Sequence, residues 1–297
     1  MFKSFVGPTT VYTAPGILGG RGPTLDFQDC KKSVHSAMVV LGMLAIRCKS
    51  AGAITEGQKA LANACLAGII IYGTFPGRSG EWHAMEASAV KEALDRQLGY
   101  IVCSQHKSCR YYGSIAKWLP PGLQEAFRVY LSLPGKTSKK FLEPARSGGA
   151  DHFSLGPALR TFGRLFTEGY EFPRVNLIRK VHHSILVRQS RTDDLLKEVG
   201  QADGHSPGMA MKVYALSGPR EDMLVGRSVY LKVFGEPVPW PEEHEFWVDF
   251  ETLDQKAQHA GYVLNDPNHA PSDLNFEDDG GIDDEDALSQ KPGSTAS

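Results

Sequence analysis

The sequence predicts a mainly α-helical protein with one small antiparallel β-sheet, an α+β fold. Several apolar runs repeat every three or four residues and begin at helix-start signals, which favours helices. Two short runs of strand composition flank a polar turn, which favours one β-hairpin. The 297 residues, 41% hydrophobic and 22% charged, suffice for one large core or for one core with a small appendage.

Three helices are expected in the first hundred residues, over about 26–45, 61–72 and 81–98. Asp26 is the expected N-cap of the first helix, and Ser50-Ala-Gly is expected to break this helix. Thr55 and Gln58 have the capping-box spacing and open the second helix, which is apolar on most faces and therefore expected to be buried. A loop over 73–80 precedes the third helix, which Gly99 is expected to end.

The expected hairpin pairs Tyr100-Ile-Val-Cys with Arg110-Tyr-Tyr-Gly-Ser-Ile and carries Lys107 near its tip. Later helices are expected over 121–131, opened by Pro121, over 155–166 and over 221–234.

The expected organisation has three parts. Residues 1–52 form an extended or disordered arm over 1–24 followed by a helix, and residues 53–219 form the functional domain. Residues 220–297 supply a helix, a Pro-rich segment and an acidic tail too poor in apolar residues to fold. Trp240, Trp247 and Phe250 lie among acidic residues there, where docking to a partner and packing onto the body are equally open interpretations.

The net charge of −2 conceals a strong asymmetry along the chain. Residues 220–297 hold 5 Lys+Arg against 18 Asp+Glu, whereas residues 1–219 hold 27 against 16. A basic body suits a protein that contacts the phosphate backbone of nucleic acid, because such contacts release condensed counterions. A solvated body with an acidic tail is the alternative interpretation.

Five scattered cysteines favour a reducing compartment over a disulfide framework. The N-terminus lacks the apolar run of a signal peptide, so secretion is not expected, and the most apolar segment, 66–75, is too short to span a bilayer. Cys103, His106 and Cys109 do not have zinc-finger spacing, and no phosphate-binding loop is present, so neither metal nor cofactor is expected.

The stretch 174–214 holds the residues with the clearest chemical meaning. Arg179 lies in a helix-like run, and His205 precedes a helix start made by Ser206 and Pro207. Helix N-termini attract anions, so an Arg, a His and the following Tyr214 are suited to phosphoryl transfer with the phenol as nucleophile.

In the order of these landmarks, residues 55–215 resemble the catalytic domain of tyrosine recombinases, the phage-integrase type, nearest the divergent branch of eukaryotic Crypton-like and DIRS-like mobile elements. Arg78-Ser-Gly-Glu81 follows a buried helix, as the family's first catalytic arginine and its trailing glutamate do. Lys107 lies on a hairpin between the two arginines, and Asn176-Leu-Ile-Arg179 occupies the place of the His-x-x-Arg motif. A Gly-His-Ser turn then precedes Tyr214, nine residues after His205.

The resemblance implies binding of double-stranded DNA and strand breakage and rejoining, as in site-specific recombination or integration, without metal or cofactor. Arg78, Arg179 and His205 would stabilise the charge on the phosphate, and Lys107 would protonate the 5′-oxygen that leaves. Tyr214 would form a covalent 3′-phosphotyrosine. The protein is expected to form homo-oligomers on DNA and to have no membrane partner. It is expected in the nucleus if the source is a eukaryote and in the cytoplasm otherwise.

Asn176 departs from the family pattern, because an amide cannot titrate as the usual histidine does. Either the site works with less acid–base help, or His182 or His183 substitutes, or the domain keeps DNA binding without cleavage. The residues before Thr55 are too few for the usual DNA-clamping domain, which is then reduced, lost or carried by a longer protein. A helical protein-interaction scaffold is the alternative from another class.

Overall fold

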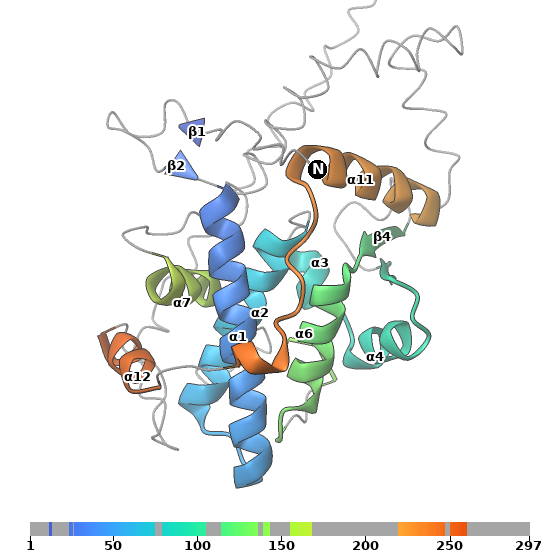
Figure 1. Cartoon of the computed structure of the whole chain (residues 1–297). Helices are drawn as coiled ribbons and strands as arrows, with labels where there is room; N and C mark the ends of the chain where they lie inside the picture. Colours follow the sequence, from blue (N-terminus) through green and yellow to red (C-terminus); the bar gives the residue numbers. More distant parts are fainter. Residues whose placement is uncertain are drawn as a thin grey trace, which may run out of the picture.

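The computed structural model describes residues 12–13, 24–25, 27–74, 79–104, 114–135, 139–142, 155–167, 219–246 and 250–259 (Figure 1). Its helices are α1 (Phe27–Ala51), α2 (Glu56–Gly73), α3 (Ser79–His83), α4 (Ala87–Asp95), α6 (Pro121–Ser132), α7 (Leu155–Phe166), α11 (Pro219–Phe234) and α12 (Phe250–His259). Its strands are β1 (Tyr12–Thr13), β2 (Thr24–Leu25), β3 (Tyr100–Cys103) and β4 (Ile115–Trp118), and η1 (Glu243–Glu245) is a short 3-10 helix. The predicted mainly helical fold with a small antiparallel sheet is confirmed at this level.

Helix α2 is the centre of the core, packed between α1, α6 and α7 (Figure 1). Its side chains from Leu61 to Tyr72 are all buried, as the apolar sequence predicts. Gly68 lets α7 approach, because a Cβ there would overlap the ring of Phe162. The Phe162 ring also stacks on Tyr72 with centroids 5.7 Å apart.

The capping box that opens α2 is formed as predicted. Gln58 N donates to Thr55 Oγ1 at 3.1 Å, and Thr55 N donates to Gln58 Oε1 at 3.0 Å. These two bonds satisfy amide groups that the first helical turn leaves without partners, so α2 begins at Glu56, before the predicted Leu61. Helix α1 extends to Ala51, past the predicted end near Ala45.

The single helix predicted over 81–98 is wrong: two helices, α3 and α4, occupy this part of the chain. Between them the backbone pairs with residues 139–141, as Phe141 N donates to Met85 O and Ala87 N donates to Lys139 O, both at 2.9 Å. Met85 itself is buried. Long-range pairing therefore interrupts the helix. The predicted end at Gly99 is also wrong, because α4 ends at Asp95 with Arg96 as its C-cap, and Gly99, with φ of 67°, lies in the turn that follows.

Strands β3 and β4 form the predicted hairpin in part. The first strand has the predicted bounds, but the second is Ile115–Trp118 instead of residues 110–115. Tyr100 pairs with Trp118 and Cys103 with Ile115, so the connection comprises residues 104–114. Burial alternates along β3, because Ile101 and Cys103 face the core while Val102 faces outward.

Part of the predicted N-terminal arm is a β-ribbon, in which Tyr12 pairs with Leu25 and Thr13 with Thr24. Helix α1 follows it and shares the core of α2 and α6. Within the described residues, the stretch Cys30–Ala51 is long and apolar enough to cross a membrane, but half of it is buried and core helices share these properties, so this is weak evidence of a span.

The predicted helices over 121–131, 155–166 and 221–234 correspond to α6, α7 and α11. After α11 an extended segment, residues 235–246, runs along α1 and α6 and ends in η1 (Figure 1). Trp240 packs against the core and lies 5.9 Å from the ring of Phe246, so this aromatic residue packs back onto the body. Helix α12, which the sequence did not predict, packs on α7 through the buried Leu253.

Candidate functional site around Glu81

The six residues predicted to be catalytic lie outside the described residues. The structure therefore neither brings them together nor separates them. They are Arg78, Lys107, Asn176, Arg179, His205 and Tyr214. Described residues next to two of them, Arg78 and Lys107, nevertheless form a connected buried site.

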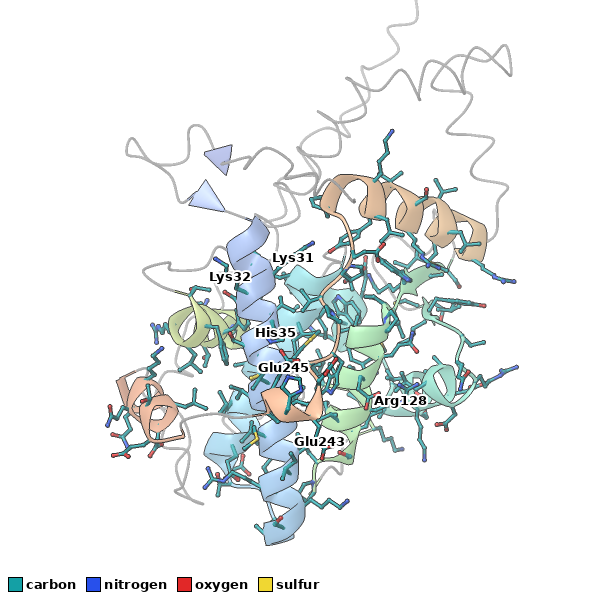
Figure 2. The ribbon with its side chains drawn as sticks, viewed as in Figure 1. Lys31, Lys32, His35, Arg128, Glu243 and Glu245 are labelled. Atoms are coloured by element: carbon teal, nitrogen blue, oxygen red, sulfur yellow. The ribbon has the colours of Figure 1, made fainter. Side chains whose placement is uncertain are left out.

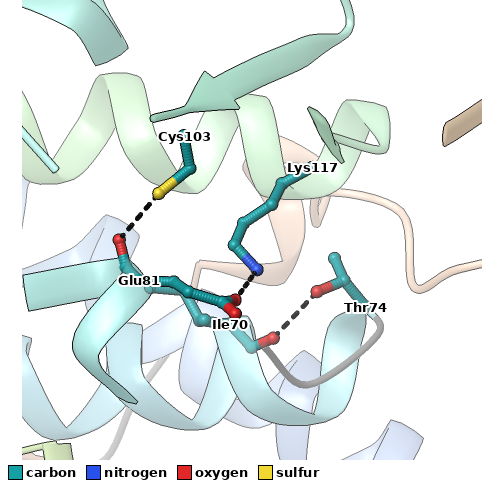
Figure 3. Close-up of polar contacts among 5 residues, drawn as sticks. All are labelled: Ile70, Thr74, Glu81, Cys103 and Lys117. Carbon is teal, nitrogen blue, oxygen red and sulfur yellow. Dashed lines mark hydrogen bonds and ion pairs between the residues drawn. The ribbon is translucent and has the colours of Figure 1, made fainter. Parts of the chain in front are cut away.

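Glu81, the trailing glutamate of the Arg78-Ser-Gly-Glu81 motif, lies on α3 and is 7% exposed. Its Oε2 accepts a 2.5 Å hydrogen bond from Lys117 Nζ, so the two side chains form an ion pair (Figure 3). Lys117 is on β4, and its side chain is 11% exposed. Helix α3 is thereby attached to the second strand of the hairpin.

Cys103 attaches α3 to the first strand. Its Sγ donates to the backbone oxygen of Glu81 at 3.6 Å, and its side chain is buried (Figure 3). Glu81 therefore contacts β4 through its carboxylate and β3 through its carbonyl. We call Glu81, Cys103 and Lys117 the Glu81 anchor.

The indole ring of Trp82 completes the surroundings of the Lys117 ammonium. Lys117 Nζ lies 5.1 Å from the centroid of the Trp82 ring, a cation–π distance. Trp82 is 1% exposed and meets Phe127 of α6 edge-on at 6.2 Å. The ammonium is thus enclosed by a carboxylate and an indole.

The burial of the Glu81–Lys117 ion pair determines its role. Removing two charges from water costs several kcal/mol per ion, which mutual attraction offsets only when the geometry is good. A pair so engaged is suited to holding α3 and β4 in one arrangement. The Glu81 anchor therefore positions α3 against the hairpin β3–β4.

The end of α2 is also well defined. Thr74 Oγ1 donates to Ile70 O at 3.0 Å (Figure 3), and the extended backbone of Thr74, with φ of −144°, ends the helix. On the other side of residues 75–78, His83 Nε2 accepts a 3.3 Å hydrogen bond from Leu155 N at the start of α7. Both elements that flank Arg78 in the chain are thus fixed to the core.

Sequence reasoning missed Lys117 and Trp82 as parts of a site and considered Cys103 only as a metal ligand. One signal was available for Lys117. It lies two residues from both Ile115 and Leu119, and residues two apart share one face of a strand. A lysine on an apolar face needs a buried partner. Nothing in the local pattern identifies that partner as Glu81.

No metal site is found among the described residues. They contain no group of three His, Cys, Asp or Glu side chains able to hold a metal ion. Four cysteines, Cys30, Cys48, Cys65 and Cys103, are buried and do not form disulfide bonds. His106 and Cys109, weighed above as metal ligands, lie outside the described residues.

Comparisons of the chain with protein-family models, with curated proteins and with solved structures gave no match.

Proposed function

We propose that this chain binds double-stranded DNA and breaks and rejoins its strands through a covalent 3′-phosphotyrosine at Tyr214. Arg78 and Arg179 each offer a planar pair of N–H donors to the non-bridging oxygens of the phosphodiester. His205 adds a further donor to the charge that develops in the transition state. Lys107 protonates the 5′-oxygen as the strand breaks.

The observation that carries the proposal is the Glu81 anchor. Arg78 precedes Glu81 by three residues, and Lys107 follows Cys103 by four. Glu81 and Cys103 are in contact, so the anchor joins the two chain segments from which this mechanism takes its first guanidinium and its ammonium. A reaction at one phosphate needs its charged groups held within a small volume, and a buried connection of this kind supports that arrangement.

The order of the described elements is also consistent with the proposal. The buried helix α2 ends shortly before Arg78, and the antiparallel hairpin β3–β4 follows α3 and α4. Two further helices, α6 and α7, precede the stretch 174–214. The motif resemblance requires this succession of buried helix, hairpin and helices.

A nicked DNA substrate that loses a short fragment after cleavage tests the proposal, because rejoining is then prevented and a covalent protein–DNA adduct accumulates. We expect an adduct on denaturing gels with the wild-type chain and none with Tyr214→Phe. The matched control Tyr100→Phe removes a hydroxyl from β3 and retains the adduct. An adduct that persists in Tyr214→Phe contradicts the assignment of the nucleophile.

Asn176 favours a second candidate, a DNA-binding protein of the same descent that no longer cleaves. Such a protein binds DNA with an affinity that falls steeply with salt and forms no adduct. The variant Asn176→His distinguishes reduced from lost activity. If acid–base help is the missing part, this variant raises the rate of adduct formation by about 100-fold or more.

A further inference from the structure

The C-terminal part of the described chain contacts the hairpin at β4. Helix α11 lies beside this strand (Figure 1). Tyr230 of α11 is 3% exposed and meets the ring of Trp118 at a centroid distance of 5.5 Å. The guanidinium carbon of Arg227 lies 5.5 Å from the centroid of the same ring. Trp118, the last residue of β4, is therefore held by two side chains of α11.

The extended segment 235–246 contacts the chain again just beyond β4. Helix α6 begins at Pro121, three residues after the strand ends. A Cβ on Gly122 would overlap the carbonyl oxygen of Val238 and lie 3.1 Å from Trp240 N. The backbone of the extended segment thus passes directly over the start of α6, and only a glycine leaves room for it.

The same segment is attached to α1 along its length. Lys31 Nζ donates to Glu236 O at 2.9 Å. His35 Nε2 and Glu245 Oε1 face one another at 3.3 Å (Figure 2). The ring of Phe246 fills the space beside Gly42. The segment is therefore held against the body at both ends.

We propose that Arg227, Tyr230 and residues 238–240, which we call the C-terminal clamp, set the position of hairpin β3–β4. The clamp holds β4 at Trp118 and holds the start of α6 at Gly122. Because β4 carries Lys117, the clamp also steadies the Glu81 anchor. Where the proposed function applies, Tyr230 is a positioning residue for the hairpin that carries Lys107.

The size of the hairpin explains why it needs such support. Each strand has four residues, and an isolated two-stranded hairpin is marginally stable in water. The Glu81 anchor supports its inner face. The outer face is open at β3, where Val102 is 51% exposed, and α11 supports the β4 side. A substitution that loosens α11 is therefore expected to destabilise β3 and β4 before the other elements.

Hydrogen exchange of the full chain without DNA tests the clamp. In Tyr230→Leu and in Gly122→Ala we expect the amides of β3 and β4, and the adjacent Leu119 N–H that is bonded to Gly99 O, to exchange at least tenfold faster, while amides of α2 are unchanged. Gly122→Ala keeps the test open if Tyr230→Leu fails to fold. Tyr230→Phe retains the ring and restores wild-type exchange. Val225→Ala, an exposed control on the same helix, has no effect.

Unchanged exchange in β3 and β4, or an equal acceleration in α2, overturns the clamp. Because exchange needs no DNA chemistry, a chain that forms no adduct leaves this result valid. In a chain that does form the adduct, Tyr230→Leu is expected to slow its formation at least tenfold and Tyr230→Phe to leave it unchanged. An adduct rate unaffected by Tyr230→Leu overturns the link between the clamp and the reaction.

Discussion

The Tyr130 hydroxyl donates a 2.6 Å hydrogen bond to Asn63 Oδ1 across the buried contact between α6 and α2. Tyr130 is 2% exposed and Asn63 5% exposed, so water cannot replace this bond. A polar pair in an apolar interface defines one register between two helices, because any shift leaves a buried polar group without its partner.

Removing the Tyr130 hydroxyl measures the value of this bond. We expect Tyr130→Phe to lower the free energy of unfolding by about 1–3 kcal/mol, because the Asn63 side chain then loses its described partner in a buried position. Urea unfolding gives the value. In the double variant Tyr130→Phe with Asn63→Leu, part of the loss returns, and an additive loss contradicts this account.

Breaking the Glu81–Lys117 pair is expected to cost more than replacing it. Lys117→Met alone removes the ammonium that pairs with the buried Glu81 carboxylate and lowers the free energy of unfolding by about 3–5 kcal/mol. The double variant Glu81→Leu with Lys117→Met removes both charges and is expected to be markedly more stable than either single variant. A cycle of urea unfolding measurements tests this, and additive single effects contradict it.

Gly68 is expected to tolerate no side chain. In Gly68→Ala the new methyl group overlaps the ring of Phe162, which is itself buried, so we expect the free energy of unfolding to fall by about 1–3 kcal/mol. Phe162→Leu in the same chain provides room and is expected to remove this penalty. Gly52→Ala is not an equivalent control, because the backbone there has φ of 68° and any side chain is strained.

The stability of the fold is expected to fall at alkaline pH. Burial raises the pKa of the Cys65 thiol well above its ordinary value of 9.0. The unfolded thiol ionises near pH 9 while the folded thiol stays protonated. Stability is therefore full below pH 9 and decreases above it, by about 1.4 kcal/mol per pH unit for this group.

Urea unfolding between pH 8 and pH 10 measures this slope, and Cys65→Ala is expected to reduce it. Burial also raises the pKa of Tyr230 to about 12, so tyrosines contribute at higher pH, where the unfolded phenol ionises. Equal slopes for the wild-type chain and Cys65→Ala contradict the assignment. Alkylation of Cys65 in the folded chain at pH 8 is expected to require unfolding.

Elements whose signals are local were predicted well. The reciprocal bonds of Thr55 and Gln58 involve residues three apart, and Pro121 at the first turn of α6 needs no distant partner. The bounds of α7, 155–166, were predicted correctly because its apolar stripe is strong and regular. The Pro-rich segment and the α11 helix before it were likewise recognisable from their composition.

Elements whose bounds depend on distant contacts were not predicted well. Residues 84–86 have helix-forming composition, but their backbone pairs with residues 139–141, and this pairing divides the predicted helix. Strand β4 begins at Ile115 because its partner Cys103 ends β3 there, and composition alone favoured the preceding residues. The predicted catalytic residues remain predictions, since they lie outside the described part of the chain.

The sequence by itself determined most of the helical segments, the presence of the hairpin β3–β4 and the burial of α2, because capping, periodicity and composition act over a few residues. Only the tertiary structure decided that Lys117 lies against Glu81, that Cys103 bonds the same residue and that the C-terminal segment passes over Gly122. Such contacts join residues far apart in the chain, and they form where packing leaves a buried charge or a narrow space that one particular partner can fill.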